Sequence, residues 1–434
     1  MSMKKGVIIA TASALVLGSL AGCGSKTGTE NTASPAPGGQ TVIDIYQFKV
    51  EFKDQFEAVA KAYEKANPNV KINISTVGGG DDYGASLKAK FASGAEPAIF
   101  NVGGPQDVAD WKNKLADLSD TEAAKKALSG SLTGVTVDNK TYGLPFSQEG
   151  YGLLYNKEVF KKAGIDPATI TSYDALVKAV ETLDAKKKDI GIEAPFAFAA
   201  KETWITGLHL SNPFFAAEFD NDINKVYQAK EIEFKYQDQL KKMIDLQQKY
   251  SVQPTVSLDY SRQVEELFSQ GKVAITQQGN WVYNAIADID KDFADNNVGL
   301  LPIPVQGVKE DVVPVGIPMY WAVNESKDDA TKKASKDFLD WLYTSDEGKR
   351  AVLEDFKFVP AYDGYDTAKI ADPISREVYR FAQEGKTSSW VFMGYPSAWG
   401  MDKLGADIQQ YISGKLPWDQ LVKNAKDTWK AARQ

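Results

Sequence analysis

The sequence predicts an α/β protein with two lobes, each a mostly parallel sheet flanked by helices. The chain has 434 residues, more than one hydrophobic core normally serves, so two lobes are expected. From residue 41 onward, segments with strand periodicity alternate with segments of helical periodicity. That alternation is typical of parallel sheets covered on both faces. A composition of 43% hydrophobic and 25% charged residues fits a globular protein.

The first 22 residues have the pattern of a secretory signal peptide. Lys4 and Lys5 precede an apolar run at 7–20, which is too short to span a bilayer as a helix. The run ends in Leu20-Ala21-Gly22-Cys23, which resembles the lipobox of bacterial lipoproteins. This resemblance implies that Cys23 is lipidated and becomes the mature N-terminus. The alternative, a buried structural Cys, has no core pattern around it.

Residues 23–40 are expected to form the lipidated Cys and a flexible tether, because 24–40 contain no large apolar residue. The folded body begins at 41. Strands are expected at 41–46, 70–74 and 98–102, and helices at 52–63, 87–91 and 108–115. The same alternation continues less clearly through 151–300. Parallel sheets bind ligands at the carboxyl ends of their strands, where loops meet helix starts.

The charge and the rare residue types exclude several functions. A formal net charge of -8 argues against nucleic acid as a partner. The five arginines all lie at or after Arg262, and so few guanidinium groups favour an uncharged ligand, although a compositional bias toward lysine explains the scarcity equally well. With one Cys and one His, no zinc cluster is possible, and no metal or cofactor is expected.

A glycine-rich loop at 78–84 lies between an expected strand and an expected helix. It lacks the third glycine of the dinucleotide fingerprint and the Gly-Lys-Ser/Thr of a P-loop. Asp81 and Asp82 would repel a phosphate. Two interpretations remain open: the two carboxylates accept hydrogen bonds from ligand hydroxyls in a cleft, or they cap the following helix.

No catalytic motif is present. His209 has no Ser or Cys partner in a nucleophile motif, and a single His of this kind is usually structural. A glycosidase needs only a pair of carboxylates, and the 58 acidic residues make chance pairs inevitable. A carbohydrate-active hydrolase therefore stays open as an alternative.

The nine tryptophans separate into two groups. Trp418 and Trp429 share one stripe of the last helix and are predicted to be core, as are Trp111 and Trp341. The remaining five lie among Gly, Asn, Ser and Pro in expected loops or helix starts: Trp204, Trp281, Trp321, Trp390 and Trp399. Aromatic rings stack on the apolar faces of sugars, so each of the five either lines a sugar-binding cleft or packs beneath a loop.

Three stretches resemble the family 1 solute-binding proteins of bacterial ABC transporters, the branch that includes maltose-binding proteins. The first comprises Tyr142–Pro145, Gly152–Lys157 and Phe160–Ile165. The second runs from Phe268 to Ile275 and continues to Gly279-Asn280-Trp281, and the third is Lys333–Arg350. Together they cover nearly the whole mature chain, in the family's order.

The resemblance implies a two-lobed, type II periplasmic-binding-protein-like fold with three hinge crossings. We expect these crossings near Ser147–Gly150, Leu301–Val305 and Glu354–Pro360. Lobe 1 would then comprise 41–148 and 304–356, and lobe 2 would comprise 149–303 and 357–434.

The resemblance also implies the ligand contacts. Glu149 stands where relatives have a glutamate that accepts sugar hydroxyls, and Trp281 stands where they have a tryptophan that stacks on a sugar ring. Trp399 best matches a second stacking aromatic. Further cleft positions map onto Phe48, Gln106, Asp107, Tyr151, Trp204 and Tyr320, with Asp81 and Asp82 added from the glycine-rich loop. Many relatives have Trp after the first strand, where this chain has Tyr46 and Phe48.

These features predict an extracellular carbohydrate-binding lipoprotein of an ABC importer. It would be a monomer held on the outer face of the cytoplasmic membrane through Cys23, and it would perform no chemistry. Lobe closure would capture a neutral oligosaccharide, such as an α-linked di- to tetrasaccharide, for delivery to the membrane permease. The alternatives are a secreted carbohydrate-active hydrolase and a binding protein for another solute such as a peptide, polyamine or iron.

Overall fold

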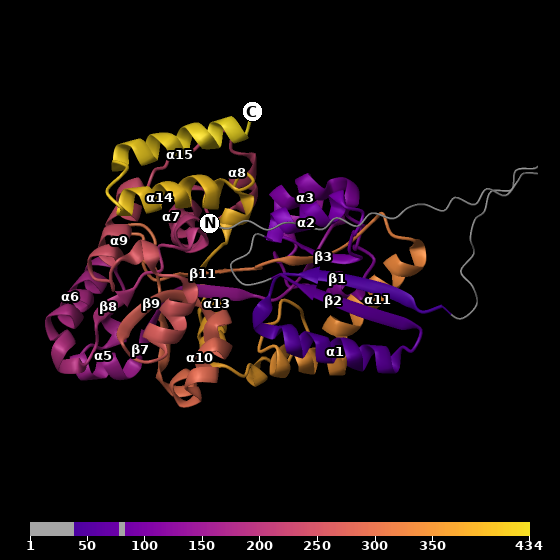
Figure 1. The fold of residues 1–434 in the computed structure, drawn as a ribbon, viewed down its shortest axis with the longest axis horizontal. Helices are drawn as coiled ribbons and strands as arrows, with labels where there is room; N and C mark the ends of the chain where they lie inside the picture. Colours follow the sequence, from indigo (N-terminus) through magenta and orange to yellow (C-terminus); the bar gives the residue numbers. More distant parts are fainter. Residues whose placement is uncertain (1–38, 78–82) are drawn as a thin grey trace, which may run out of the picture. The chain divides into compact units, whose positions relative to one another are not determined.

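The computed structural model describes residues 39–77 and 83–434, and Figure 1 shows their arrangement around two large β-sheets. Each sheet has its own hydrophobic core. The first core draws its buried residues from 43–146 and 317–362, and the second from 151–313 and 374–429. Cys23, Asp81 and Asp82 lie outside the described residues.

The first sheet has the strand order β2-β1-β3-β12-β6. Its strands are β1 (Thr41–Gln47), β2 (Val70–Thr76), β3 (Ile99–Val102), β6 (Leu144–Pro145) and β12 (Tyr320–Val323). β1 pairs in parallel with β2 along its whole length and with β3 at Ile45 and Tyr46. The parallel strands β1, β2 and β3 therefore end at one edge of the sheet.

Helices cover both faces of the first sheet. They are α1 (Lys53–Ala66), α2 (Tyr83–Ala92), α3 (Pro105–Trp111), α4 (Glu122–Lys126), α11 (Asp329–Thr344) and α12 (Asp346–Arg350). Tyr63 of α1 packs against Phe338 of α11, so these helices share a face. Phe91 of α2 and Trp111 of α3 pack on Phe100 of β3. A hairpin of β4 (Thr136–Val137) and β5 (Lys140–Thr141) follows α4.

The second sheet has the order β13-β11-β7-β9-β8, with β10 also paired to β7. Its strands are β7 (Glu149–Asn156), β8 (Ala194–Ala197), β9 (Val273–Gly279), β10 (Val298–Leu301), β11 (Val313–Gly316) and β13 (Thr387–Ser388). Both β7 and β9 are buried along their entire length. Burial on both faces accounts for the continuous apolar and small residues of these strands.

Most of the helices surround the second sheet. They are α5 (Lys157–Ala163), α6 (Tyr173–Ile190), α7 (Asn212–Glu218), α8 (Ile223–Gln228), α9 (Gln237–Lys249), α10 (Tyr283–Ile289), α13 (Pro373–Gln383), α14 (Ala406–Ile412) and α15 (Trp418–Ala432). α5 and α6 end at Gly164 and Gly191, whose φ angles of 72° and 77° are left-handed. Figure 1 shows α14 and α15, in yellow, lying together.

The α/β class is confirmed, but the expectation of mostly parallel sheets is wrong. β12 runs antiparallel to β3 and β6, and β7 runs antiparallel to β9, β10 and β11. The reason lies in the chain path. β7 and β12 are the first strands after the chain passes from one sheet to the other, and β12 thus starts at the edge where the parallel strands of the first sheet end.

Two of the three crossings between the sheets lie at other positions than expected. β11 pairs with β7 and β13 of the second sheet, so the chain returns to the first sheet between β11 and β12 and not near Leu301–Val305. Ala361 and Tyr362 are buried in the first core, so the last crossing follows them and not Glu354–Pro360. The remaining passage, from β6 to β7, lies at 146–148.

The expected helix faces match the burial. Phe56, Val59, Ala60 and Tyr63 are the buried residues of α1, and the predicted core positions Trp418 and Trp429 are both buried in α15. None of the helices in the described ranges, 39–77 and 83–434, is long and apolar enough to cross a membrane.

Candidate ligand-binding site

Three segments from the two sheets meet at one place. Lys49 follows the end of β1 in the first sheet, Glu149 is the first residue of β7, and Trp281 follows the end of β9. Pairing of Tyr151 with Gly279 holds the last two strands side by side. The turn after β9 is also held to β7, because the backbone N–H of Gly150 donates to Asn280 Oδ1 over 3.1 Å.

Lys49 and Glu149 form a buried ion pair between the two sheets. The distance from Lys49 Nζ to Glu149 Oε1 is 2.5 Å, and the side chains are only 7% and 5% exposed. Burial lowers the pKa of Lys49, but the carboxylates of Glu149 and Glu51 outweigh burial and raise this pKa above its usual value. Lys49 is therefore charged, and Glu149 already has a cationic partner.

An aromatic cluster surrounds His209, and we define it as Tyr151, Trp204, His209, Trp281, Trp390 and Phe392. The imidazole stacks on Tyr151 with ring centroids 4.4 Å apart. The other four rings lie 5.1–5.5 Å from it. Burial, together with the nearby charge of Lys49, lowers the pKa of His209 to about 3. His209 is thus neutral at physiological pH, and the cluster presents apolar ring surface with little charge.

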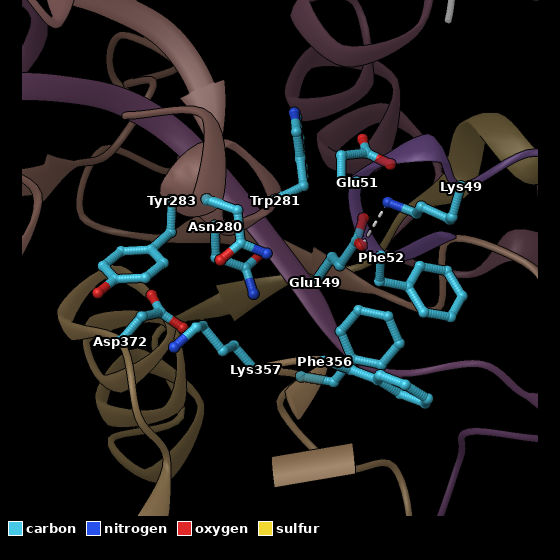
Figure 2. A pocket seen from close by; sticks show the side chains of 12 residues that line it. Lys49, Glu51, Phe52, Glu149, Asn280, Trp281, Tyr283, Phe356, Lys357 and Asp372 are labelled. Carbon is cyan, nitrogen blue, oxygen red and sulfur yellow. Dashed lines mark hydrogen bonds and ion pairs between the residues drawn. The ribbon is translucent and has the colours of Figure 1, made fainter. Parts of the chain in front are cut away.

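Two cavities adjoin this cluster. The first, which we call the Trp281 cavity, has a volume of about 20 Å³ and is lined by Lys49, Glu149 and Trp281 together with residues of α10, the segment 356–358 and Asp372 (Figure 2). The second, the Trp390 cavity, has a volume of about 510 Å³ and is lined by Trp390, Tyr320, Asp222 and many Ser, Thr, Asn and Gly residues. Trp281 and Trp390 are edge to face at 6.4 Å, so the cluster connects the two cavities.

The structure brings several of the expected site residues together. Glu149 and Trp281 line the Trp281 cavity, Tyr320 lines the Trp390 cavity, and Trp204 lies 6.4 Å from Trp281 in the cluster. Phe48 lies beside Lys49, whose Nζ is 5.6 Å from its ring centroid.

Other expected contacts are already satisfied within the protein. Tyr151 is fully buried, and its hydroxyl donates to the backbone oxygen of His209. It therefore holds His209 in place within the cluster and has no surface left for a ligand. Gln106 accepts a hydrogen bond from Arg433 and donates to Asp110. Asp107 accepts one from the backbone N–H of Gly103, and burial raises its pKa. Neither Gln106 nor Asp107 lines the two cavities.

The expectation that Trp399 stacks on the ligand is wrong. Its side chain is 1% exposed, packs edge to face on Trp429 at 4.8 Å and donates from Nε1 to Thr428 Oγ1. The loop-like sequence around it forms a short π-helical segment, Trp399–Gly405, that turns the ring into the second core. Trp321 is core as well, stacked on Phe146.

The sequence did not single out two residues of the site. Trp390 was one of five loop tryptophans, and nothing in its neighbourhood distinguished it from Trp399. Lys49 is adjacent to the expected Phe48, but its contact with Glu149 depends on pairing across the two sheets. In the described part of the chain, no group of three or more His, Cys, Asp or Glu side chains is placed to hold a metal ion.

Comparisons with known proteins agree with this geometry. The model of the family described as bacterial extracellular solute-binding protein matches residues 49–349. The melibiose/raffinose/stachyose-binding protein MelE of Bacillus subtilis is 24% identical over 427 residues, which is 93% of each chain. The multiple sugar-binding protein of Streptococcus mutans is 25% identical over 61% of this chain and 63% of its own.

Solved structures show the same fold. A chitin oligosaccharide binding protein superposes with a TM-score of 0.76 at 25% identity, covering 91% of this chain and 99% of its own. The solute-binding protein RafE in complex with raffinose has a TM-score of 0.74 at 18% identity, over 91% and 100% of the two chains.

Proposed function

The chain belongs to the family of bacterial extracellular solute-binding proteins, and from this membership we propose that it captures a neutral oligosaccharide for an ABC importer. The observation that carries the proposal is the aromatic cluster, whose rings border two cavities with polar side chains in their linings. Sugar rings have apolar faces that stack on aromatic side chains and hydroxyl rims that take polar partners.

The charges near the cluster support a neutral ligand. Lys49 is compensated by Glu149 and His209 is neutral, so the cluster has no unpaired charge that would select an anion or a cation. Serine, threonine and asparagine side chains and glycine backbone line most of the Trp390 cavity and supply uncharged hydrogen-bond partners, and the carboxylate of Asp222 in its lining already accepts the backbone N–H groups of Asn224 and Lys225. Names of relatives and structural neighbours include melibiose, raffinose, stachyose and chitin oligosaccharide, so a di- to tetrasaccharide is the ligand class we propose.

In this proposal Trp281 provides the stacking surface, the largely buried Trp390 packs edge to face against it at the border of the second cavity, and Glu149 accepts sugar hydroxyls while it stays paired with Lys49. Ligand contacts from both sheets exist only when the two lobes are close, so binding would shift the protein toward a closed state. The closed form would then deliver the sugar to the permease. The protein would act as a monomer and perform no chemistry.

Binding without turnover is the first prediction. Calorimetry with melibiose, raffinose, stachyose and chitin oligosaccharides should show at least one sugar binding at about one per chain, in a pocket of ordinary ligand size. The sugar should be recovered intact after prolonged incubation. Hydrolysis products that disappear on removal of a specific carboxylate pair would favour the hydrolase alternative. Absence of binding to every sugar in the panel would contradict the proposed ligand class.

Membrane anchoring through Cys23 is the second prediction, and it rests on the lipobox-like segment and the tether after it. Cys23→Ala should leave a folded protein that no longer sediments with membranes, because Cys23 is the chain's one cysteine and the lipidation position of the lipobox-like segment. Cell fractionation of both versions, with ligand affinity as the check on folding, measures this. If the alanine variant stays with the membrane as completely as the wild type, the anchor is not at Cys23.

A further inference from the structure

The Trp281 cavity continues beyond the residues expected from the sequence. Past Trp281 and Glu149 it is lined by Tyr283, Lys357 and Asp372, which Figure 2 shows grouped on one side of the cavity. These residues come from α10, from the segment that follows the first core's helices, and from the start of α13. None of them has a role in the function proposed above.

Asp372 has one occupied and one free carboxylate oxygen. Its side chain is 1% exposed, and Oδ1 accepts the backbone N–H of Ser375 over 2.7 Å as the N-cap of α13. Oδ2 is buried and has no hydrogen-bond partner among the described residues. Helix capping thus explains one oxygen and leaves the other without an explanation.

The free oxygen is held in place by a hydrogen-bond network. Asn280 Nδ2 donates to Ser375 Oγ over 2.9 Å, and Asn280 Oδ1 accepts the backbone N–H of Gly150. Asp372 is therefore fixed relative to β7 and to the turn that carries Trp281. Lys357 lies with its Nζ 5.4 Å from the ring centroid of Tyr283. Burial raises the pKa of Asp372 and the charges of Arg376 and Lys357 oppose that rise, but neither of these two side chains forms a hydrogen bond with Oδ2.

We propose that Asp372 is a ligand-binding residue, whose free oxygen accepts a hydrogen bond from a hydroxyl of the oligosaccharide at the far end of the Trp281 cavity. This proposal rests on the proposed function. A buried acceptor without a partner is unfavourable, so a ligand hydroxyl that pairs with it gains a charge-assisted hydrogen bond. Burial raises the pKa of Asp372 to about 6, in keeping with a carboxyl group that lacks full compensation.

The charges of the cavity indicate the chemistry of this ligand group. Lys49 and Lys357 oppose Glu51, Glu149 and Asp372 within the same lining. The two lysines would repel a cationic ligand group, and the three carboxylates would repel an anionic one. A hydroxyl group can both donate to and accept from this lining, and the volume of about 20 Å³ admits a group of that size, so the subsite fits a hydroxyl of an uncharged sugar.

The test measures raffinose and stachyose affinity by calorimetry, with melting temperature recorded for each variant. Asp372→Asn keeps the shape and the capping oxygen, and Asp372→Ser keeps a capping oxygen while removing Oδ2. Both should weaken whichever of the two sugars the wild type binds by about 10–100-fold, the loss of a hydrogen bond to a charged group. Asp328→Asn is the matched control, since Asp328 is the N-cap of α11 and accepts the backbone N–H of Thr331. It should leave affinity unchanged.

The outcomes separate the two proposals. If the wild type binds a probe and both Asp372 variants bind it equally well, Asp372 only caps α13 and the inference is overturned while the proposed function stands. If the wild type binds neither raffinose nor stachyose, nor any sugar of the wider panel, the proposed function fails and this inference fails with it. Weaker binding in both Asp372 variants, with the Asp328 variant unchanged, supports the subsite.

Discussion

Trp399→Ala is expected to lower the free energy of unfolding by about 3–5 kcal/mol, as removal of a buried aromatic side chain usually does. Ligand affinity of the protein that remains folded should stay nearly unchanged. The reason is the position of the ring, which is 1% exposed and packed on Trp429 in the second core. Denaturant unfolding gives the stability, and calorimetry under native conditions gives the affinity.

Trp281→Ala should show the opposite pattern. Its ring is only half-buried and lines a cavity, so truncation should cost about 2–4 kcal/mol of binding free energy, the size of an interface hot spot, and less stability than the core substitution does. Loss of binding in a fully folded Trp399→Ala variant, or wild-type affinity in Trp281→Ala, would contradict the division of the tryptophans into site and core.

The elements of the first sheet could be predicted because their signals are local. The helical spacing of Phe56, Val59, Ala60 and Tyr63 and the strand that begins at Thr41 are visible within a dozen residues, and both agree with the structure. Strand direction depends on contacts between distant segments. β12 pairs with β3, more than two hundred positions earlier in the chain, and no local pattern distinguishes this antiparallel partner from a parallel one.

The residues of the site could likewise be predicted where the sequence signal is local, and not where it depends on tertiary packing. Glu149 and Trp281 lie in family motifs, and the structure places both in the lining of one cavity. Trp390 and Trp399 have almost the same loop-like surroundings in the sequence and both belong to the second core, yet Trp390 also borders a cavity and Trp399 does not. Their difference comes from a π-helical turn and from packing against α15, which only the tertiary structure reveals.

Lys49→Met is expected to destabilise the protein by about 3–5 kcal/mol near neutral pH, because it leaves a buried carboxylate without its partner. Lys49 and Glu149 are almost fully buried and join the two sheets. Lys53→Met is the control, since Lys53 and Glu57 are 3.8 Å apart and largely exposed. Its effect should be below about 1 kcal/mol, as for most surface ion pairs.

The deficit of Lys49→Met should also depend on pH. Burial raises the pKa of Glu149, and the charge of Lys49 partly opposes that rise. Without Lys49 this pKa rises further. A carboxyl group with a higher pKa in the folded than in the unfolded state takes up a proton on folding, so stability falls as pH rises above the unfolded value of about 4.3.

Melts at about pH 5 and about pH 8 should therefore show a small deficit at the lower pH and a large one at the higher pH. Adding Glu149→Gln to Lys49→Met removes the unpaired charge and should recover much of the loss at the higher pH, since a neutral amide is far less costly to bury than a carboxylate. A single variant that melts like the wild type at both pH values would show that water reaches Glu149. The ion pair would then not be the buried contact that holds the two sheets together at the edge of the aromatic cluster.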